Sequence, residues 1–163
     1  MPIHAETLRA LIDRELDQIS DARVTTDILS LLVEPRTVLC DWDYGKLGEQ
    51  HLCWEVLSAG VSIVYCESGF GPRCPWGLVA LKQNASMGMD SGWFTSFTNA
   101  YFDCHAADLP IWRVFKTAPS GIREPVTEEG PWDATWKLVM ELRESDRVAR
   151  YDCDHSIVYD RRS

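Results

Sequence analysis

The sequence predicts a single α+β domain, in which an antiparallel sheet of about five or six strands carries helices from both ends of the chain on one face. Apolar residues recur at helical spacing near both ends of the chain. Eight of the ten glycines lie between residues 45 and 92, where the apolar runs are short and β-branched or aromatic. Helices at the ends with strands and turns between them are typical of the α+β class.

Two short amphipathic helices are expected within residues 1–35. The first, over residues 5–19, places its leucines and isoleucines on one face. The second has Asp21, or a threonine shortly after it, as its N-cap, because a short side-chain oxygen can accept from the free backbone N–H groups of a first turn. Pro35 is expected to mark the end of this helix.

Residues 36–116 are expected to form the sheet together with one helix. Turn-forming residues at 43–45 and 58–60 separate the first strands, and the second of these turns is typical of a β-hairpin. Asp90 or Ser91 would cap the helix of this region. The simplest arrangement is an antiparallel meander, with strands predicted over 37–42, 51–57, 61–67, 77–82, 86–89 and 111–115.

The last part of the chain predicts a loop, a helix and a closing strand. Residues 117–131 hold three prolines and two glycines, which indicates a long loop. Residues 132–163 predict a helix over 133–147 and then a strand of alternating pattern that pairs with the sheet. In that strand Asp152 and Asp154 face one side, and Cys153 and His155 the other. Each side offers two ligands, so no metal site is predicted there.

The chain is acidic along its whole length. Its formal net charge is −9, and counting acidic against basic side chains gives −4 over residues 1–35, −2 over 36–120 and −3 over 121–163. Spread negative charge opposes binding to nucleic acid and to anionic lipid. It favours solubility and a basic protein partner. No apolar stretch is long enough to span a bilayer, so no membrane association is expected.

The six cysteines are expected to be free thiols. The start of the chain has neither the basic region nor the apolar region of a signal peptide, which predicts a cytoplasmic protein in a reducing compartment. No Cys-X-X-Cys spacing occurs, and the closest two cysteines are eight residues apart, so neither a zinc site nor another cofactor is predicted. The phosphate-loop, dinucleotide, zinc-protease and serine-hydrolase motifs are all missing from the sequence.

No catalytic residue is assigned, although a thiol–imidazole pair is the simplest active site that this composition could supply. The candidates are Cys66 or Cys74 as the nucleophile, with His51 or His105 as the base. The alternative is that every thiol fills the core. Such an enzyme site would lie beside the loop over residues 69–77.

The connection around residues 69–77 is the candidate partner-binding segment. Its glycines and prolines permit a tight and well-defined loop that presents large aromatic and charged side chains. Aromatic and arginine side chains are typical of interface hot spots. In the alternative, the loop folds back and its aromatic rings are buried. The predicted partner-binding residues are Glu67, Phe70, Arg73 and Trp76.

These features favour a non-catalytic cytoplasmic protein that binds a protein partner, such as a bacterial immunity protein or antitoxin-type inhibitor that occludes a basic toxin or enzyme. A small enzyme with a cysteine–histidine or carboxylate site is the first alternative. The second is a ligand-binding or assembly domain, including a homodimer formed through an exposed sheet edge.

Overall fold

The computed structural model describes residues 3–68, 72–87 and 92–157 and confirms the α+β class. Its contacts group into two compact units, residues 1–105 and 106–163, and each unit has its own sheet. The sequence predicts one domain over residues 1–163 with one sheet, whereas the structure has two separate sheets. Within the described residues, no helix has the length and apolar character needed to cross a bilayer.

The two predicted N-terminal helices are confirmed as α1 (Ala5–Leu16) and α2 (Ala22–Leu31). Asp21 is the N-cap of α2, where its side chain accepts a hydrogen bond of 2.9 Å from the backbone N–H of Arg23. Each helix buries one apolar stripe, as its spacing predicts. The buried members of these stripes are Leu8 and Ile12 on α1 and Val24 and Ile28 on α2.

Pro35 does not end α2, which stops four residues earlier at Leu31. Strand β1 (Leu32–Trp42) begins at the next residue, and Pro35 lies buried inside it. The pairing of β1 with its neighbour shifts register between Leu32 and Arg36, so the proline sits at an irregularity. A bulge is where a strand tolerates a residue that lacks an N–H donor.

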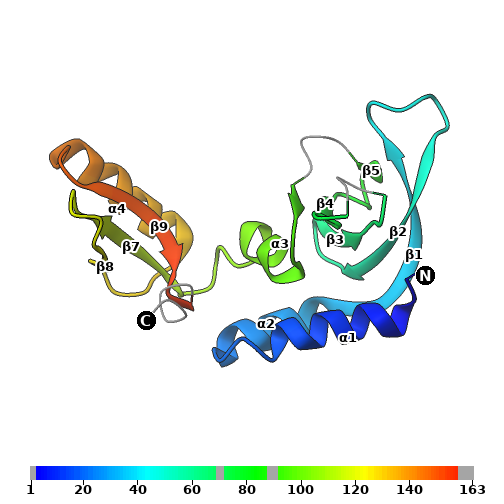
Figure 1. Cartoon of the computed structure of the whole chain (residues 1–163), viewed down its shortest axis with the longest axis horizontal. Helices are drawn as coiled ribbons and strands as arrows, with labels where there is room; N and C mark the ends of the chain where they lie inside the picture. The colour runs from blue at the N-terminus through cyan, green and yellow to red at the C-terminus, as the bar shows by residue number, and fades with distance from the viewer. Residues whose placement is uncertain (1–2, 69–71, 88–91, 158–163) are drawn as a thin grey trace. The chain divides into compact units, whose positions relative to one another are not determined.

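The first unit contains a six-stranded sheet with the order β5-β1-β2-β3-β4-β6 (Figure 1). Strands β1 to β4 form the predicted antiparallel meander, and β6 adds to it antiparallel. Strand β5 instead returns to the far edge and pairs parallel with β1. The strands after β1 are β2 (Gln50–Leu57), β3 (Ser62–Tyr65), β4 (Trp76–Val79), β5 (Ser86–Met87) and β6 (Trp93–Phe94).

The helix of the middle region, α3 (Phe97–Cys104), begins later than expected. Phe94, which follows the predicted caps, belongs to β6 and not to the helix. Ser96 caps the helix, and its Oγ accepts from the backbone N–H of Asn99 at 3.2 Å. The predicted caps Asp90 and Ser91 lie outside the described residues.

The second unit is a three-stranded sheet covered by one helix. Trp136 and Val139 of the helix pack against Val114 and Tyr151 of the sheet. The predicted C-terminal helix therefore covers this small sheet, and the predicted loop over 117–131 contains a strand. The elements are β7 (Trp112–Thr117), β8 (Arg123–Pro125), α4 (Trp132–Ser145) and β9 (Arg150–His155), with β7 in the centre of the sheet.

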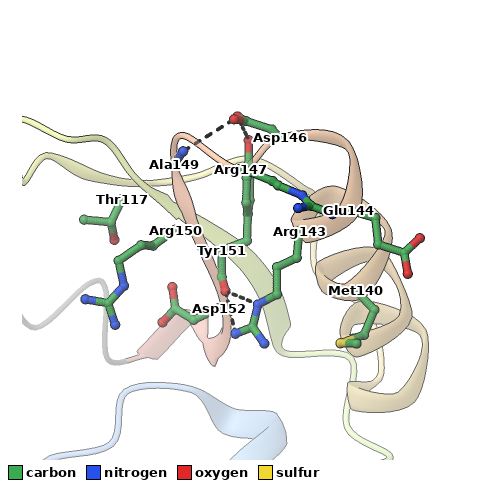
Figure 2. A pocket seen from close by; sticks show the side chains of 10 residues that line it. All are labelled: Thr117, Met140, Arg143, Glu144, Asp146, Arg147, Ala149, Arg150, Tyr151 and Asp152. Carbon is green, nitrogen blue, oxygen red and sulfur yellow. Dashed lines mark hydrogen bonds between the residues drawn. The ribbon is translucent and has the colours of Figure 1, made fainter.

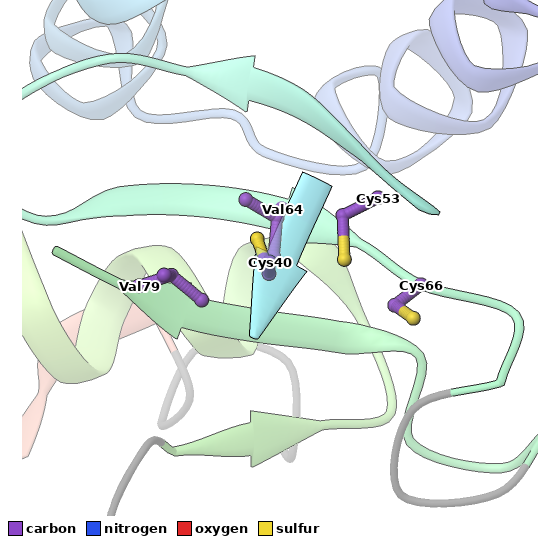
Figure 3. Packing of buried hydrophobic residues seen from close by; sticks show 5 residues of the cluster. All are labelled: Cys40, Cys53, Val64, Cys66 and Val79. Atoms are coloured by element: carbon purple, nitrogen blue, oxygen red, sulfur yellow. The ribbon is translucent and has the colours of Figure 1, made fainter. Parts of the chain in front are cut away.

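Alternate side chains of β1 and β2 face the two sides of the larger sheet. The inner face carries a buried cluster, shown in Figure 3, of Cys40, Cys53, Val64, Cys66 and Val79. On the outer face Trp76 packs against Phe97 of α3, at a ring distance of 5.6 Å. The outer face of the β1–β2 hairpin is less covered, and it carries the first feature of the candidate site.

Candidate functional site

The β1–β2 hairpin exposes four large apolar side chains. Leu39 of β1 and Leu52 of β2 are cross-strand neighbours on the outer face, with exposures of 55% and 56%. In the connection between the strands Tyr44 is 69% exposed and Leu47 is fully exposed. We call these four residues the hairpin surface. Single exposed leucines are common on proteins, but a local group of them indicates a contact site.

Local hydrogen bonds fix the shape of the connection between β1 and β2. The backbone N–H of Gly45 donates to the carbonyl of Trp42 at 2.9 Å. The Glu49 side chain accepts from the N–H of Lys46, and the Glu49 N–H donates to the Lys46 carbonyl, both at 2.9 Å. Gly48 has a φ of +83°, a conformation that residues with a Cβ rarely adopt. The hairpin surface is therefore presented on an ordered turn.

Acidic side chains surround the hairpin surface. Residues 37–53 contain three exposed acids, Asp41, Asp43 and Glu49, and one exposed base, Lys46. Glu67 adds a fourth exposed acid, because residues 66–68 run alongside β2. The local charge is negative, like that of the whole chain.

Of the predicted partner-binding residues, the structure leaves two at the surface. Glu67 and Arg73 are exposed. Phe70 lies outside the described residues. Trp76 is only 3% exposed and packs between Tyr65 and Phe97, with a ring distance of 5.0 Å to Tyr65. Trp76 is a core residue, as in the alternative interpretation of this loop.

The exposed leucines of the hairpin were not among the predicted site residues, although the sequence contains a signal for them. In both strands a leucine directly precedes a cysteine, as Leu39-Cys40 and Leu52-Cys53. Because a strand alternates its faces, burial of the two cysteines places both leucines on the opposite side.

All six cysteines are free thiols, and three of them form a row on the inner face of the sheet. Cys40, Cys53 and Cys66 are each 0% exposed (Figure 3). Cys40 lies in β1, Cys53 lies in β2, and Cys66 directly follows the end of β3. The thiol of Cys53 is hydrogen-bonded to both of the others. These two hydrogen bonds, and to a smaller extent burial, raise the pKa of Cys53.

Cys66 is also in contact with a short polar chain that leads towards the surface. Its Sγ lies 3.6 Å from Oγ of Ser68, and that Oγ lies 3.4 Å from Nδ1 of His51. Nε2 of the same imidazole is 3.7 Å from Oε1 of Glu49. The predicted candidates Cys66 and His51 are thus brought near each other, with Ser68 between them.

Hydrogen bonds to the sulfur of Cys66 lower the pKa of this thiol to about 6. The largest contribution comes from the thiol of Cys53, which outweighs the opposing effect of burial. The hydroxyl and backbone N–H of Ser68 and the charge of His51 act in the same direction. This arrangement can hold a thiolate.

The other thiol and imidazole candidates have different surroundings. His105 stacks on Tyr101 at a ring distance of 6.2 Å, and burial lowers its pKa. Burial and the neighbouring Asp103 raise the pKa of Cys104. Cys74 is half-buried. The polar chain from Cys66 to the surface runs through His51 and not through His105.

The alternation predicted for the C-terminal strand is confirmed. Asp152 and Asp154 of β9 lie on one side, where both accept hydrogen bonds from Arg123, at 2.7 and 3.1 Å. Cys153 packs on the other side against the buried cluster of Val114 and Val139. Among the described residues no group of three or more histidine, cysteine or carboxylate side chains converges as a metal site would require.

A cleft of about 690 Å³ in the second unit lies between α4 and β9 (Figure 2). Three arginines and three acids line it, so its charges balance. Arg143 is already engaged, since its Nε and Nη2 donate to the carbonyl of Tyr151 at 2.9 and 2.8 Å. Asp146 accepts from the Tyr151 hydroxyl at 2.7 Å. The cleft shows no selective charge for a ligand.

No family model, curated protein or solved structure matches the chain.

Proposed function

We propose that this is a non-catalytic binding protein that takes a basic protein partner on the β1–β2 hairpin, in the manner of an immunity protein or an antitoxin-type inhibitor. The observation that carries the proposal is the pair of exposed leucines, Leu39 and Leu52, on an ordered hairpin that also exposes Tyr44 and Leu47.

Apolar and aromatic side chains at the hairpin surface supply binding free energy when a partner removes them from water. Burial of a leucine side chain contributes about 2 kcal/mol. Tyrosine is among the residue types that dominate interface energetics, because its ring is large and rigid and its hydroxyl can stay hydrogen-bonded. Leu39 and Leu52 are cross-strand neighbours on one face, so one partner surface can cover both of them.

The acids around the hairpin surface favour a basic partner. Asp41, Asp43, Glu49 and Glu67 are exposed, and the whole chain carries a formal charge of −9. Opposite charge on the partner accelerates encounter and disfavours acidic competitors.

The ordered turn limits what binding costs in conformational entropy. The hydrogen bonds of Gly45 and Glu49 hold the connection before any partner arrives. A surface that is already ordered loses little freedom on association. This property suits an inhibitor that binds tightly without catalysis.

Affinity capture from the source cells, with three baits, tests the proposal. The wild-type protein is expected to retain a stoichiometric partner with an excess of lysine and arginine, and the double variant Leu39→Asp/Leu52→Asp is expected to lose it. Leu29→Asp is the matched control, because Leu29 is a 62% exposed leucine on α2, outside the hairpin.

Two outcomes would overturn the proposal. In the first, nothing retained by the wild-type bait is lost from the double variant, or the lost protein is acidic. In the second, light scattering shows a wild-type dimer that the double variant converts to a monomer, which would assign the hairpin surface to a second copy of this chain.

A further inference from the structure

The row of buried thiols in the first unit has chemistry that partner binding does not use. We propose that Cys66 is a peroxide-reactive thiol and that Cys53 resolves it to a disulfide between β2 and the end of β3. This inference is independent of the proposed binding function, since it concerns the inner face of the sheet.

The register of the sheet places the two sulfur atoms together. Trp54 pairs with Tyr65, and one step further the same antiparallel register sets Cys53 opposite Cys66. The Sγ of Cys66 lies 3.8 Å from the carbonyl of Leu52, which confirms that the chain still runs alongside β2 there. Directly opposed residues have Cβ atoms about 4.5–5.5 Å apart, close to the separation of about 4 Å in disulfides.

The groups around Cys66 favour its thiolate. Ser68 can donate its hydroxyl hydrogen to the sulfur while its Oγ accepts from Nδ1–H of His51. Glu49 faces the other nitrogen of the ring, with its Oε1 3.7 Å from Nε2. The thiols of Cys53 and, behind it, Cys40 are the remaining titratable groups of the row. The hydrogen bond from the Cys53 thiol contributes most to the lowered pKa of Cys66, and the hydroxyl and backbone N–H of Ser68 and the charge of His51 act in the same direction.

The reaction uses hydrogen peroxide as its oxidant and balances in two steps. The Cys66 thiolate attacks one peroxide oxygen, the O–O bond breaks, and the leaving hydroxide takes a proton to become water, which leaves a sulfenic acid. The Cys53 sulfur then attacks the sulfenic sulfur, forms the S–S bond and releases a second water. Two thiols and one hydrogen peroxide thus give one disulfide and two waters.

Burial of Cys66 selects for a small oxidant. The residue is 0% exposed, whereas Ser68 is exposed and the His51 side chain is 24% exposed. A molecule as small as hydrogen peroxide can reach the sulfur along this polar chain with a local opening, and a bulky aromatic disulfide reagent cannot. We therefore expect peroxide to react with Cys66 faster than such a reagent does.

The test treats the full chain with hydrogen peroxide and follows the loss of two hydrogens by intact mass, with peptide mapping of the link. The expected product is the Cys53–Cys66 disulfide, which dithiothreitol reverses. We expect a rate that is half-maximal near pH 6, the pKa of the Cys66 thiol. Ser68→Ala and, by a smaller amount, His51→Gln should raise the midpoint, and a rise of about one pH unit would slow the reaction about twofold at pH 7.

Cys74→Ser is the matched control, because Cys74 is a half-buried thiol outside the row, and its rate should equal the wild-type rate. His51 and Ser68 are not core residues, so their variants should stay folded, as circular dichroism would check. Oxidation of Cys66 no faster than that of Cys74, the absence of a Cys53–Cys66 link, or a pH profile unchanged in His51→Gln would each overturn the proposal.

Discussion

Residues that are adjacent in the strands of the β1–β2 hairpin differ in solvent exposure, because they lie on opposite faces of the sheet. Cys40 and Cys53 are fully buried on the inner face, whereas Leu39 and Leu52, one position earlier on each strand, are more than half exposed on the outer face. A shift of register by one residue would exchange them.

The difference shows that the two faces of the hairpin have different surroundings. The thiols lie inside, where Cys53 and Cys66 contact each other, and the leucines lie on the outer face, which Asp41 shares. Each face therefore has its own proposed use, a thiol reaction on the inner face and recognition of a partner on the outer face.

The largest expected effect is a difference in the free energy of unfolding between two variants at adjacent positions, Cys40→Asp and Leu39→Asp. Cys40→Asp places an unpaired carboxylate in the buried cluster and should lower the free energy of unfolding by about 4 kcal/mol. Leu39→Asp should change it by no more than about 0.5 kcal/mol, because the side chain is already in water. Urea unfolding monitored by tryptophan fluorescence measures both. Equal stabilities would contradict the assignment of the two faces.

A smaller effect is expected from added volume on the inner face. A Cβ at Gly77 would lie 2.8 Å from the ring of Trp93, its cross-strand partner. Gly77→Ala should therefore destabilise the first unit by about 2 kcal/mol. Gly60→Ala is the matched control, since nothing lies within 4 Å of its Cβ, and it should be neutral or slightly stabilising. If thermal unfolding gives the same midpoint for both variants, the inner face is not closely packed.

The smallest of these effects concerns Glu55, a carboxylate at the inner side of β2. Burial opposes its charge, but hydrogen bonds from Ser62, Arg36 and Ser58 outweigh burial and hold the pKa of Glu55 below its ordinary value. The Ser62 hydroxyl donates to it at 2.7 Å and Nε of Arg36 at 2.6 Å. Glu55→Gln should cost about 1 kcal/mol at neutral pH.

The pH dependence of that difference follows from the direction of the shift. A carboxylate with a lowered pKa in the folded state stabilises the protein above its unfolded pKa of about 4.3, and this contribution is lost as the pH falls through the folded value. The wild-type protein and Glu55→Gln should therefore converge in acid. Unfolding curves at pH 7 and pH 3 measure this, and a difference that stays constant would rule out the charged pair.

Local elements could be predicted from the sequence, whereas contacts between distant segments could not. The two N-terminal helices and the Asp21 cap follow from spacing within a few residues. The burial of Trp76 depends on Phe97, a residue of the later helix α3. The second sheet depends on pairing between β7 and β9, which no local pattern specifies.

In the candidate sites, too, the residue types could be predicted from the sequence, whereas the contacts between distant segments could not. Cysteine and histidine chemistry left Cys66 or Cys74, with His51 or His105, as candidates. The role of Ser68 as the hydroxyl between Cys66 and His51 could not be predicted, because it depends on residues 66–68 running alongside β2. The exposure of the two leucines follows from strand alternation only if the neighbouring cysteines face inwards, and the sequence alone does not specify that. The predicted anchor Trp76 was placed on the loop, and the structure puts it in β4.

Hydrogen–deuterium exchange of the protein alone and with its captured partner tests the binding proposal most directly. Protection on binding should concentrate in residues 39–52 and around Glu67, where the hairpin surface and its acids lie. Protection confined to residues 106–157, with none in the hairpin, would contradict it.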